Sequence, residues 1–206
     1  MTIWFTSDHH FGHARVIEYS HRPFTSAEEM DEAFITNWNA CVRPGDSVYH
    51  LGDFSFRRAE ETLHIVRRLA GQKFLVRGNH DRWLGAPAKI TEGWAWVGDY
   101  KEIKVGEQKI VLCHYPFLTW RSRHHGAWHL HGHSHGSLKE DLTTKRIDVG
   151  VDAVSKLLHF GDCAALGIDC RPGSVYRPIS LEEVSVQMAL RGIGVVDHHE
   201  TRSHDE

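Results

Sequence analysis

The sequence predicts an α/β protein with largely parallel strands, and three observations support this fold class. Short apolar runs alternate with helical patterns through the first 80 residues. Such a β-α-β-α-β alternation implies right-handed crossovers between parallel neighbouring strands. Histidines and acidic residues directly follow several of the apolar runs, where open α/β sheets place their ligands. The second half of the chain is richer in strand patterns than the first.

In the first half, three strands are expected, at residues 3–7, 47–51 and 73–76. Ser26-Ala27-Glu28-Glu29 is a capping-box pattern, and apolar residues recur at helical spacing after it. A second amphipathic helix is expected to end at Gly71, because glycine commonly follows the last turn of a helix. Each helix therefore connects two neighbouring strands.

The second half begins with a predicted hairpin that turns through Gly106-Glu107. Its strands, and two later ones, are expected at residues 100–105, 109–113, 128–130 and 147–151. Ser180 is predicted to cap a further helix. Residues 155–176 show no regular period, because glycines and prolines interrupt every pattern. We expect one domain over residues 1–195 and a disordered tail over 196–206, which is charged and rich in histidine.

Five short polar segments carry the residue types that two adjacent metal ions need. Together they offer carboxylates, imidazoles and one amide, without a thiolate, which suits Mn²⁺, Fe or Zn²⁺ rather than a structural cysteine-zinc site. The segments are Asp8-His9-His10, Gly52-Asp53, Gly78-Asn79-His80-Asp81, His114 and Gly132-His133-Ser134-His135.

Each segment has an ordinary interpretation when it is taken alone. A single histidine is usually a surface or core residue, and a Gly-Asp pair is usually a turn. Five such coincidences in one order, each at a predicted strand end, favour a common site. Spacing supports this interpretation, because His133 and His135 share a face of extended backbone, as do Asp8 and His10.

In this order the motifs resemble those of the calcineurin-like metallophosphoesterase superfamily, in particular its small bacterial and phage members. The resemblance runs from Ile3 to His135 and implies a two-sheet αββα sandwich with the metal site in loops at the carboxyl ends of strands. It also implies that Asp53 bridges two divalent metals, Mn²⁺ foremost, with Fe or Zn²⁺ as alternatives. One metal would take Asp8, His10 and His135, and the other Asn79, His114 and His133.

The implied reaction is hydrolysis of a phosphoester by a metal-bridging hydroxide that attacks phosphorus in line with the leaving group. His80 would lie beside the substrate as general acid, because imidazole titrates near neutrality. Asp81 would stand behind His80 and fix its tautomer. The alternative for His80 is a purely structural histidine. A non-catalytic scaffold with the same fold is the competing class, and the retained His80 argues against it.

Substrate recognition is less sharply indicated. His13, Arg57, Arg121 and Arg123 are candidate substrate-binding residues, with a solvated basic loop as the alternative for the arginines. The tryptophans could stack on an aromatic group, although packing is their commoner role. We expect phosphodiesters to be preferred over monoesters, because a monoester dianion needs an additional cationic clamp. A phosphomonoesterase, a nucleotidase and a nuclease are the alternatives.

Composition limits the remaining function classes. The chain has 206 residues, a net charge of −3 and 41% hydrophobic residues, so it can bury a full core and gives no global electrostatic case for nucleic acid or membrane. Its four cysteines form no C-x-x-C pair and are expected to be thiols in a reducing compartment. With neither a signal peptide nor a membrane-spanning run, we expect a cytoplasmic location.

Overall fold

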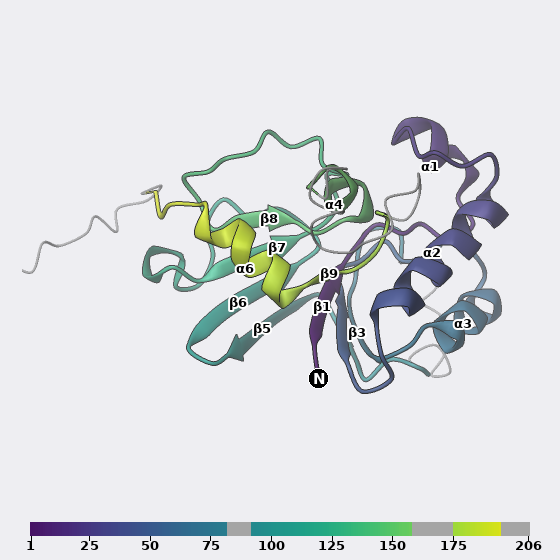
Figure 1. Cartoon of the computed structure of the whole chain (residues 1–206), viewed down its shortest axis with the longest axis horizontal. Coiled ribbons are helices and arrows are strands. Elements are labelled where there is room, and N and C mark those ends of the chain that lie inside the picture. Colours follow the sequence, from purple (N-terminus) through teal and green to yellow (C-terminus); the bar gives the residue numbers. More distant parts are fainter. Residues whose placement is uncertain (82–91, 158–174, 195–206) are drawn as a thin grey trace, which may run out of the picture.

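Two mixed β-sheets with helices beside them make up the computed structural model, which describes residues 1–81, 92–157 and 175–194 (Figure 1). The first sheet has the order β4-β3-β2-β1-β9, and the second has the order β5-β6-β7-β8. The first sheet contains β1 (Ile3–Thr6), β2 (Ser47–His50), β3 (Gln72–Val76), β4 (Trp96–Gly98) and β9 (Ile179–Ser180). The second contains β5 (Tyr100–Val105), β6 (Gln108–Cys113), β7 (Trp128–His131) and β8 (Arg146–Asp148).

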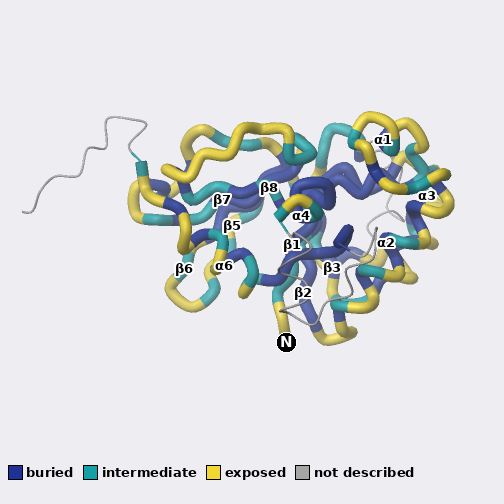
Figure 2. Tube along the Cα trace, turned by 45° about the horizontal axis from the view of Figure 1, so that its top comes forward, coloured by how far each residue is buried: buried dark blue, intermediate teal, exposed yellow. Residues whose placement is uncertain are grey.

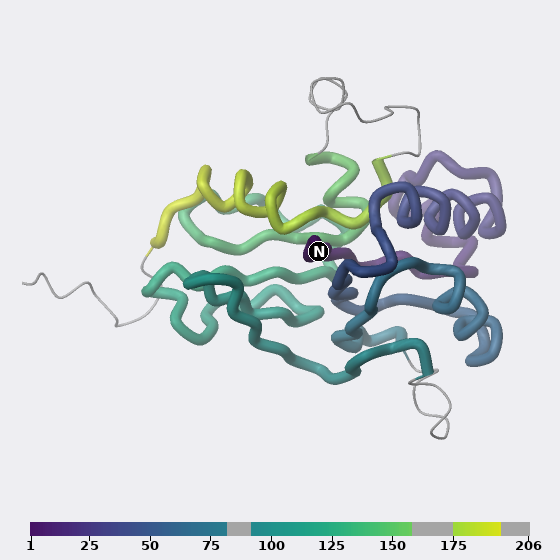
Figure 3. The backbone as a smooth tube through the Cα atoms, turned by 60° about the horizontal axis from the view of Figure 1, so that its bottom comes forward, coloured from purple at the N-terminus to yellow at the C-terminus, as the bar shows by residue number. Residues whose placement is uncertain are grey.

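The described helices are α1 (Ala14–Tyr19), α2 (Ala27–Cys41), α3 (Ala59–Arg68), α4 (Val151–Leu157), α6 (Leu181–Ala189) and a 3₁₀ turn at Arg123–His125. Helices α2 and α3 lie beside the first sheet (Figure 1). Helix α6 runs from β9 along the half of the molecule that holds residues 100–150 (Figure 3). There the Lys145 side chain, next to β8, donates to the carbonyl of Met188 at 2.6 Å.

The strand directions confirm the predicted fold class. Strands β1, β2, β3 and β4 are parallel to their neighbours, and only β9 runs antiparallel in the first sheet. In the second sheet, β5 and β6 form the predicted antiparallel hairpin, whereas β6, β7 and β8 are parallel. The parallel strands therefore bring their carboxyl ends to one edge of each sheet, and a single bridge between Ser7 and Gly150 joins the two edges.

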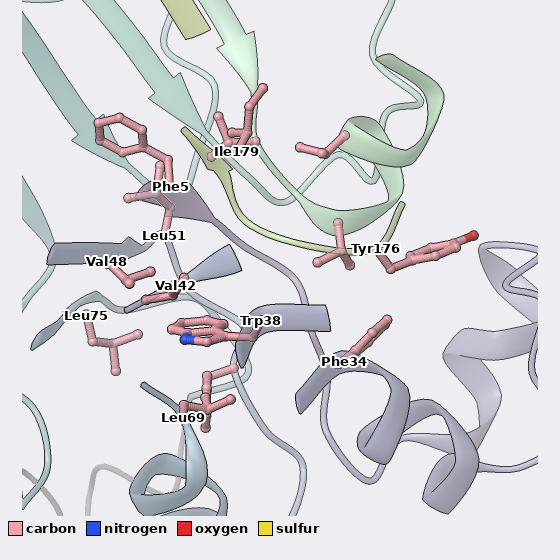
Figure 4. Packing of buried hydrophobic residues seen from close by; sticks show 14 of the residues in the cluster. Phe5, Phe34, Trp38, Val42, Val48, Leu51, Leu69, Leu75, Tyr176 and Ile179 are labelled. Atoms are coloured by element: carbon pink, nitrogen blue, oxygen red, sulfur yellow. The ribbon is translucent and has the colours of Figure 1, made fainter. Parts of the chain in front are cut away.

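One hydrophobic core extends across both sheets. Phe5, Val48 and Leu75 belong to the first sheet, and they share a buried cluster with Ile110 and Leu130 of the second. Figure 4 shows Trp38 of α2 among the apolar side chains of this cluster, where its indole nitrogen donates to the carbonyl of Ala70 at 3.0 Å. The burial map agrees with this arrangement, because buried residues follow most of the strands and exposed residues lie mainly on helices and loops (Figure 2). Strand β5 differs, since exposed and half-buried residues alternate along it.

Three local predictions need correction or refinement. The strand expected at residues 147–151 ends at Asp148, and α4 begins at Val151. The reason is a turn in which the Asp148 carboxylate accepts the N–H of Gly150 at 2.7 Å. Ser26 caps α2 as predicted, by accepting the N–H of Glu29, but the Glu29 carboxylate returns to Thr25 rather than to Ser26. At α6 the Ser180–Glu183 box is reciprocal.

Other predictions lie partly outside the described residues. The tail at 196–206 and most of 155–176 fall there, as do Cys163 and Cys170. Cys41 and Cys113 are free thiols. Within the described part of the chain, no helix combines the length and the apolar character needed to cross a bilayer.

Candidate metal centre

Loops that follow five strands meet at one place and carry all seven of the predicted metal ligands. The loops after β1 and β2 are tied together, since the N–H of Asp8 donates to Gly52 and that of His10 to Asp53, both at 3.0 Å. The loops after β6 and β7 are joined in the same way, from Gly132 to the carbonyl of His114 at 3.0 Å. These backbone bonds fix the loops to one another before any ligand is considered.

Asp8, His10 and His135 form the first group of possible ligands. Each offers one donor atom, and the three atoms lie within 4.8 Å of one another. The Nε2 atoms of His10 and His135 are 3.2 Å apart, in rings that stack at 14°. The Asp8 carboxylate also accepts the backbone N–H of His133 at 3.0 Å, which ties the first motif to the last.

Asp53, His114 and His133 form the second group, with donor atoms again within 4.8 Å. The side-chain oxygen of Asn79 lies 3.1 Å from Nε2 of His114 and 3.1 Å from Nδ1 of His133. The amide oxygen is therefore a fourth donor at this group. Because the Nδ1 of His114 is 2.8 Å from the carbonyl of Leu51, its proton is held there and Nε2 is left as the free donor.

Asp53 faces both groups. Its Oδ2 atom lies 3.7 Å from Nε2 of His10 and 3.5 Å from Nε2 of His114. Its other oxygen, Oδ1, accepts the backbone N–H of His80 at 2.8 Å. One oxygen is thus occupied by the loop after β3, and the other points between the two groups of ligands.

Five of the candidate ligands have a positive φ, which L-residues rarely adopt. They are Asp8, His10, Asp53, His133 and His135, with φ values between 50° and 69°. Such backbone strain costs about 1–3 kcal/mol per residue and tends to occur at functional sites. The neighbouring glycines are needed for space: a Cβ at Gly132 would come within 2.5 Å of the Asp8 carboxylate, and one at Gly78 within 2.2 Å of the Asp53 carboxylate.

Two functional residues were missed by the sequence reasoning, Arg22 and Asp152. The Asp152 carboxylate accepts from Nδ1 of His135 at 2.7 Å, so it holds that ring with Nε2 free. Arg22 donates to both Asp152 oxygens and to the carbonyl of Asp8. Burial alone would raise the pKa of Asp152, but the bonds from His135 and Arg22 outweigh it and hold that pKa below its usual range. Neither Arg22 nor Asp152 lies in one of the five polar segments. Only their burial next to the ligands marks them as part of the site.

The electrostatics of both ligand groups fit cations. Burial, followed by the charges of Asp148 and Asp53, raises the pKa of Asp8 well above its ordinary value. Burial also raises the pKa of Asp53. Buried carboxylates at this separation need nearby positive charge to stay ionised, and a divalent cation supplies it. Together with imidazole and amide donors and the absence of thiolate, they suit a borderline divalent metal.

His80 lies beside the ligands without belonging to either group. Its ring centroid is 5.6 Å from that of His10 and 4.8 Å from that of Phe56, and the side chain is partly exposed. The Asp81 carboxylate accepts the backbone N–H groups of Gly78, Asp53 and Phe54 at 2.8–2.9 Å. These contacts join the loops after β2 and β3. The support of the His80 tautomer by Asp81 stays a prediction.

The predicted substrate-binding residues divide into two kinds. His13 stacks on Phe56 at 4.0 Å, and its ring is 5.7 Å from that of His10, so it lies beside the first group. The three arginines, by contrast, contact residues outside the two ligand groups. Arg57 binds the Asp31 carboxylate of α2, Arg121 pairs with Glu102 of β5, and the buried Arg123 donates to the carbonyl of Gly194.

The structure also shows that His9 and several of the tryptophans are buried. His9 is buried, and its Nδ1 lies 2.9 Å from Nε2 of His50, so it packs under the loop instead of facing the ligands. Trp94 and Trp120 are buried as well. Trp83 lies outside the described residues.

Comparison with known proteins identifies the family. Residues 1–150 match the calcineurin-like phosphoesterase superfamily domain, so the chain belongs to this superfamily of metal-dependent phosphoesterases. An uncharacterized protein of Methanocaldococcus jannaschii is 32% identical over 161 residues, which cover 74% of this chain and 83% of that protein. The gene 66 protein of Mycobacterium phage D29 is 30% identical, over 83% of this chain and 98% of its own.

The fold has a solved counterpart. A protein of unknown function from Aquifex aeolicus is 26% identical and superimposes with a TM-score of 0.64, over 90% of this chain and 98% of its own. The two-sheet architecture predicted from the motifs therefore occurs in an experimentally determined relative.

Proposed function

We propose that this protein is a dinuclear metal-dependent phosphoesterase that prefers phosphodiesters. The observation that carries the proposal is the arrangement of two ligand groups on either side of Oδ2 of Asp53. Asp8, His10 and His135 would hold one divalent ion, and Asn79, His114 and His133 the other, with Asp53 shared. Mn²⁺ is the expected metal, with Fe and Zn²⁺ as alternatives, because the ligands combine imidazole, carboxylate and amide.

When they are bound, two such ions supply an activated water and neutralise the oxygens of the phosphate. The chain's own residues then orient the reaction. Asp152 and the Leu51 carbonyl hold the rings of His135 and His114 with Nε2 directed into the site. The N–H of His80 holds one Asp53 oxygen in place, so the other stays directed between the ligand groups.

His80 is the proposed general acid. It lies outside both ligand groups and beside the first, on the partly exposed side of the site. As the oxygen of a water that has already lost a proton bonds to phosphorus and the ester P–O bond breaks, the imidazolium of His80 would give its proton to the leaving oxygen. The backbone of the same residue is anchored to Asp53, which couples the position of the acid to that of the shared ligand.

The contacts of the arginines support the preference for diesters. Arg57, Arg121 and Arg123 already pair with a carboxylate or a carbonyl outside the ligand groups. A monoester dianion carries one more negative charge than a diester and would require such a cation. A second candidate function, phosphomonoester hydrolysis, would need a cationic side chain that pairs with the second negative charge of the substrate.

The test compares bis-p-nitrophenyl phosphate with p-nitrophenyl phosphate at saturating Mn²⁺. We expect a higher kcat/KM for the diester in the wild-type protein. Asp53→Asn should lose activity and retain less of both metals, since the substitution removes the negative charge that two cations would share. Asp141→Asn is the matched control, because Asp141 is an exposed residue whose carboxylate accepts from the N–H and the hydroxyl of Thr143. Full activity and metal content in Asp53→Asn would refute the shared-ligand assignment, whereas a monoester preference would overturn only the substrate assignment.

We also propose a cytoplasmic location. The free thiols of Cys41 and Cys113 are compatible with the reducing, cytoplasmic compartment predicted from the sequence.

A further inference from the structure

Two exposed aromatic side chains flank the candidate metal centre. Phe56 follows the loop of Asp53 and is 42% exposed, and Tyr115 follows His114 and is 45% exposed. By contrast, Phe5, Phe11 and Phe54 are fully buried. An aromatic ring left in water forgoes the stabilisation of burial, and a planar ligand that stacks on it would recover that stabilisation.

Phe56 lies on the side of the first ligand group. One face of its ring stacks on His13 at 4.0 Å and 14°, and its centroid is 4.8 Å from that of His80. The ring of His10 is 5.4 Å away. Phe56 is thus next to the proposed general acid, which protonates the leaving group.

Tyr115 lies on the side of the second ligand group. Its ring meets those of His114 and His133 edge-on, at 5.1 Å and 4.8 Å. The loop that carries Tyr115 is fixed, because the N–H of Phe117 donates to Nε2 of the buried His129 at 3.0 Å. The backbone that carries the tyrosine ring is therefore held in position before any substrate arrives.

We propose that these two rings are stacking platforms and that the substrate is a small phosphodiester with a planar aryl or nucleobase group. This inference rests on the proposed phosphodiesterase function. Tyr115 stacks on the ring of the ester group that remains on phosphorus, and Phe56 on a ring in the leaving group. Stacking of this kind tolerates different rings, because every base or aryl group has a π face.

The experiment varies only the retained ester group. Phenyl p-nitrophenyl phosphate and methyl p-nitrophenyl phosphate have the same charge and the same leaving group, so their kcat/KM ratio reports on the retained group. For the wild-type protein with Mn²⁺ we expect a phenyl-to-methyl ratio of at least about 5, the lower end of the effect of one stacked ring. Tyr115→Leu should lower the ratio by about the same factor relative to wild type, whereas Tyr115→Phe, which keeps the ring, should retain it.

The variants separate stacking from structural roles. If Tyr115 only supported His114 and His133, Tyr115→Leu would slow both esters by the same factor and leave the ratio unchanged, which would overturn the proposal. Phe56→Leu should lower kcat/KM for both esters, since they share the p-nitrophenyl leaving group, and should keep the ratio. Tyr100→Leu is the control: Tyr100 is 41% exposed, and its contacts are with Phe117 and Glu102.

Failure of the inference and failure of the proposed function are distinguishable. Hydrolysis of both esters at equal rates by the wild-type protein would reject the aromatic platforms and keep the phosphodiesterase. A lack of hydrolysis of either ester, in protein that retains Mn²⁺ and hydrolyses a monoester, would reject the phosphodiester assignment and the inference with it.

Discussion

At the residue scale, the candidate ligands are held by partners that determine which of their atoms face the site. His135 has Asp152 behind it, and His114 has the Leu51 carbonyl. Each bond occupies Nδ1 and leaves Nε2 for a metal. The two aspartates behave similarly, since Asp8 accepts from His133 and Asp53 from His80. These partners therefore determine which atom of each ligand side chain faces the metal site.

The first prediction at this scale concerns His80. His80→Asn should keep both metals, because His80 is in neither ligand group, and should slow hydrolysis by about 10²–10⁴-fold, the usual contribution of general acid catalysis. The loss should be larger for a diester with an alcohol leaving group than for bis-p-nitrophenyl phosphate, since nitrophenolate leaves without a proton. Equal losses with the two substrates would instead assign His80 to positioning.

Asp152 gives a second prediction, which tests a residue that acts through another. Asp152→Asn keeps the shape of the side chain but removes the charge that orients His135 and pairs with Arg22. We expect metal affinity to fall by about 10–100-fold, as for other partners of ligating histidines. Isothermal titration with Mn²⁺ measures the effect. Unchanged affinity would mean that the bond to His135 is dispensable.

At the element scale, the loops after parallel strands are packed so closely that some positions tolerate only glycine. A Cβ at Gly132 would lie 2.0 Å from the Ser7 hydroxyl. Gly132→Ala should therefore destabilise the protein by about 1–3 kcal/mol, the usual effect of overpacking, and should weaken metal binding through Asp8. Urea unfolding measures the change. Gly45→Ala is the control with open space around it, and should lie within about 0.5 kcal/mol of wild type. Comparable losses in both variants would contradict the packing argument.

Among the elements, some features of the fold could be predicted from the sequence and others could not. The β-α-β alternation and the residues after each strand were visible because hydrophobic periodicity is local. The positions of Asp152 and Arg22 were not, because their bonds join residues 130 positions apart. Arg57 was predicted near the substrate from its distance to Asp53 along the chain, but its guanidinium turns to Asp31 of α2. Helix α4 was missed because a single turn at Asp148–Gly150 replaces the end of a strand.

At the scale of the whole molecule, the buried histidines make stability depend on pH. Burial, with the charge of His114, lowers the pKa of His50 to about 3. Burial, with the charge of His131, lowers the pKa of His129 to about 3. Both rings are almost completely buried within the fold. In the unfolded chain they would titrate near the ordinary value of 6.5.

The sign of the effect follows from proton binding. Between pH 6.5 and 3 the unfolded chain binds more protons at these two positions than the folded protein. Above pH 6.5 the two rings are neutral in both the folded and the unfolded state, so they do not lower the free energy of unfolding. Below pH 6.5 the rings of the unfolded chain take up protons, and the free energy of unfolding therefore decreases as the pH falls. Each ring should lose about 1.36 kcal/mol per pH unit, or about 2 kcal/mol by pH 5. The raised pKa of Asp8 acts in the opposite direction below neutrality, so wild-type protein alone cannot isolate the histidines.

The last prediction uses a variant to isolate one ring. His129→Gln lacks the titrating imidazole and keeps every carboxylate. Its free energy of unfolding should be lower at pH 7, since Gln does not reproduce the ring's contacts with the 111–117 backbone. Between pH 6 and 4, however, its dependence on pH should be weaker than that of the wild type by about 1.36 kcal/mol per unit. Urea denaturation in the presence of a chelator measures both slopes, and parallel slopes would show that His129 is not held neutral by burial.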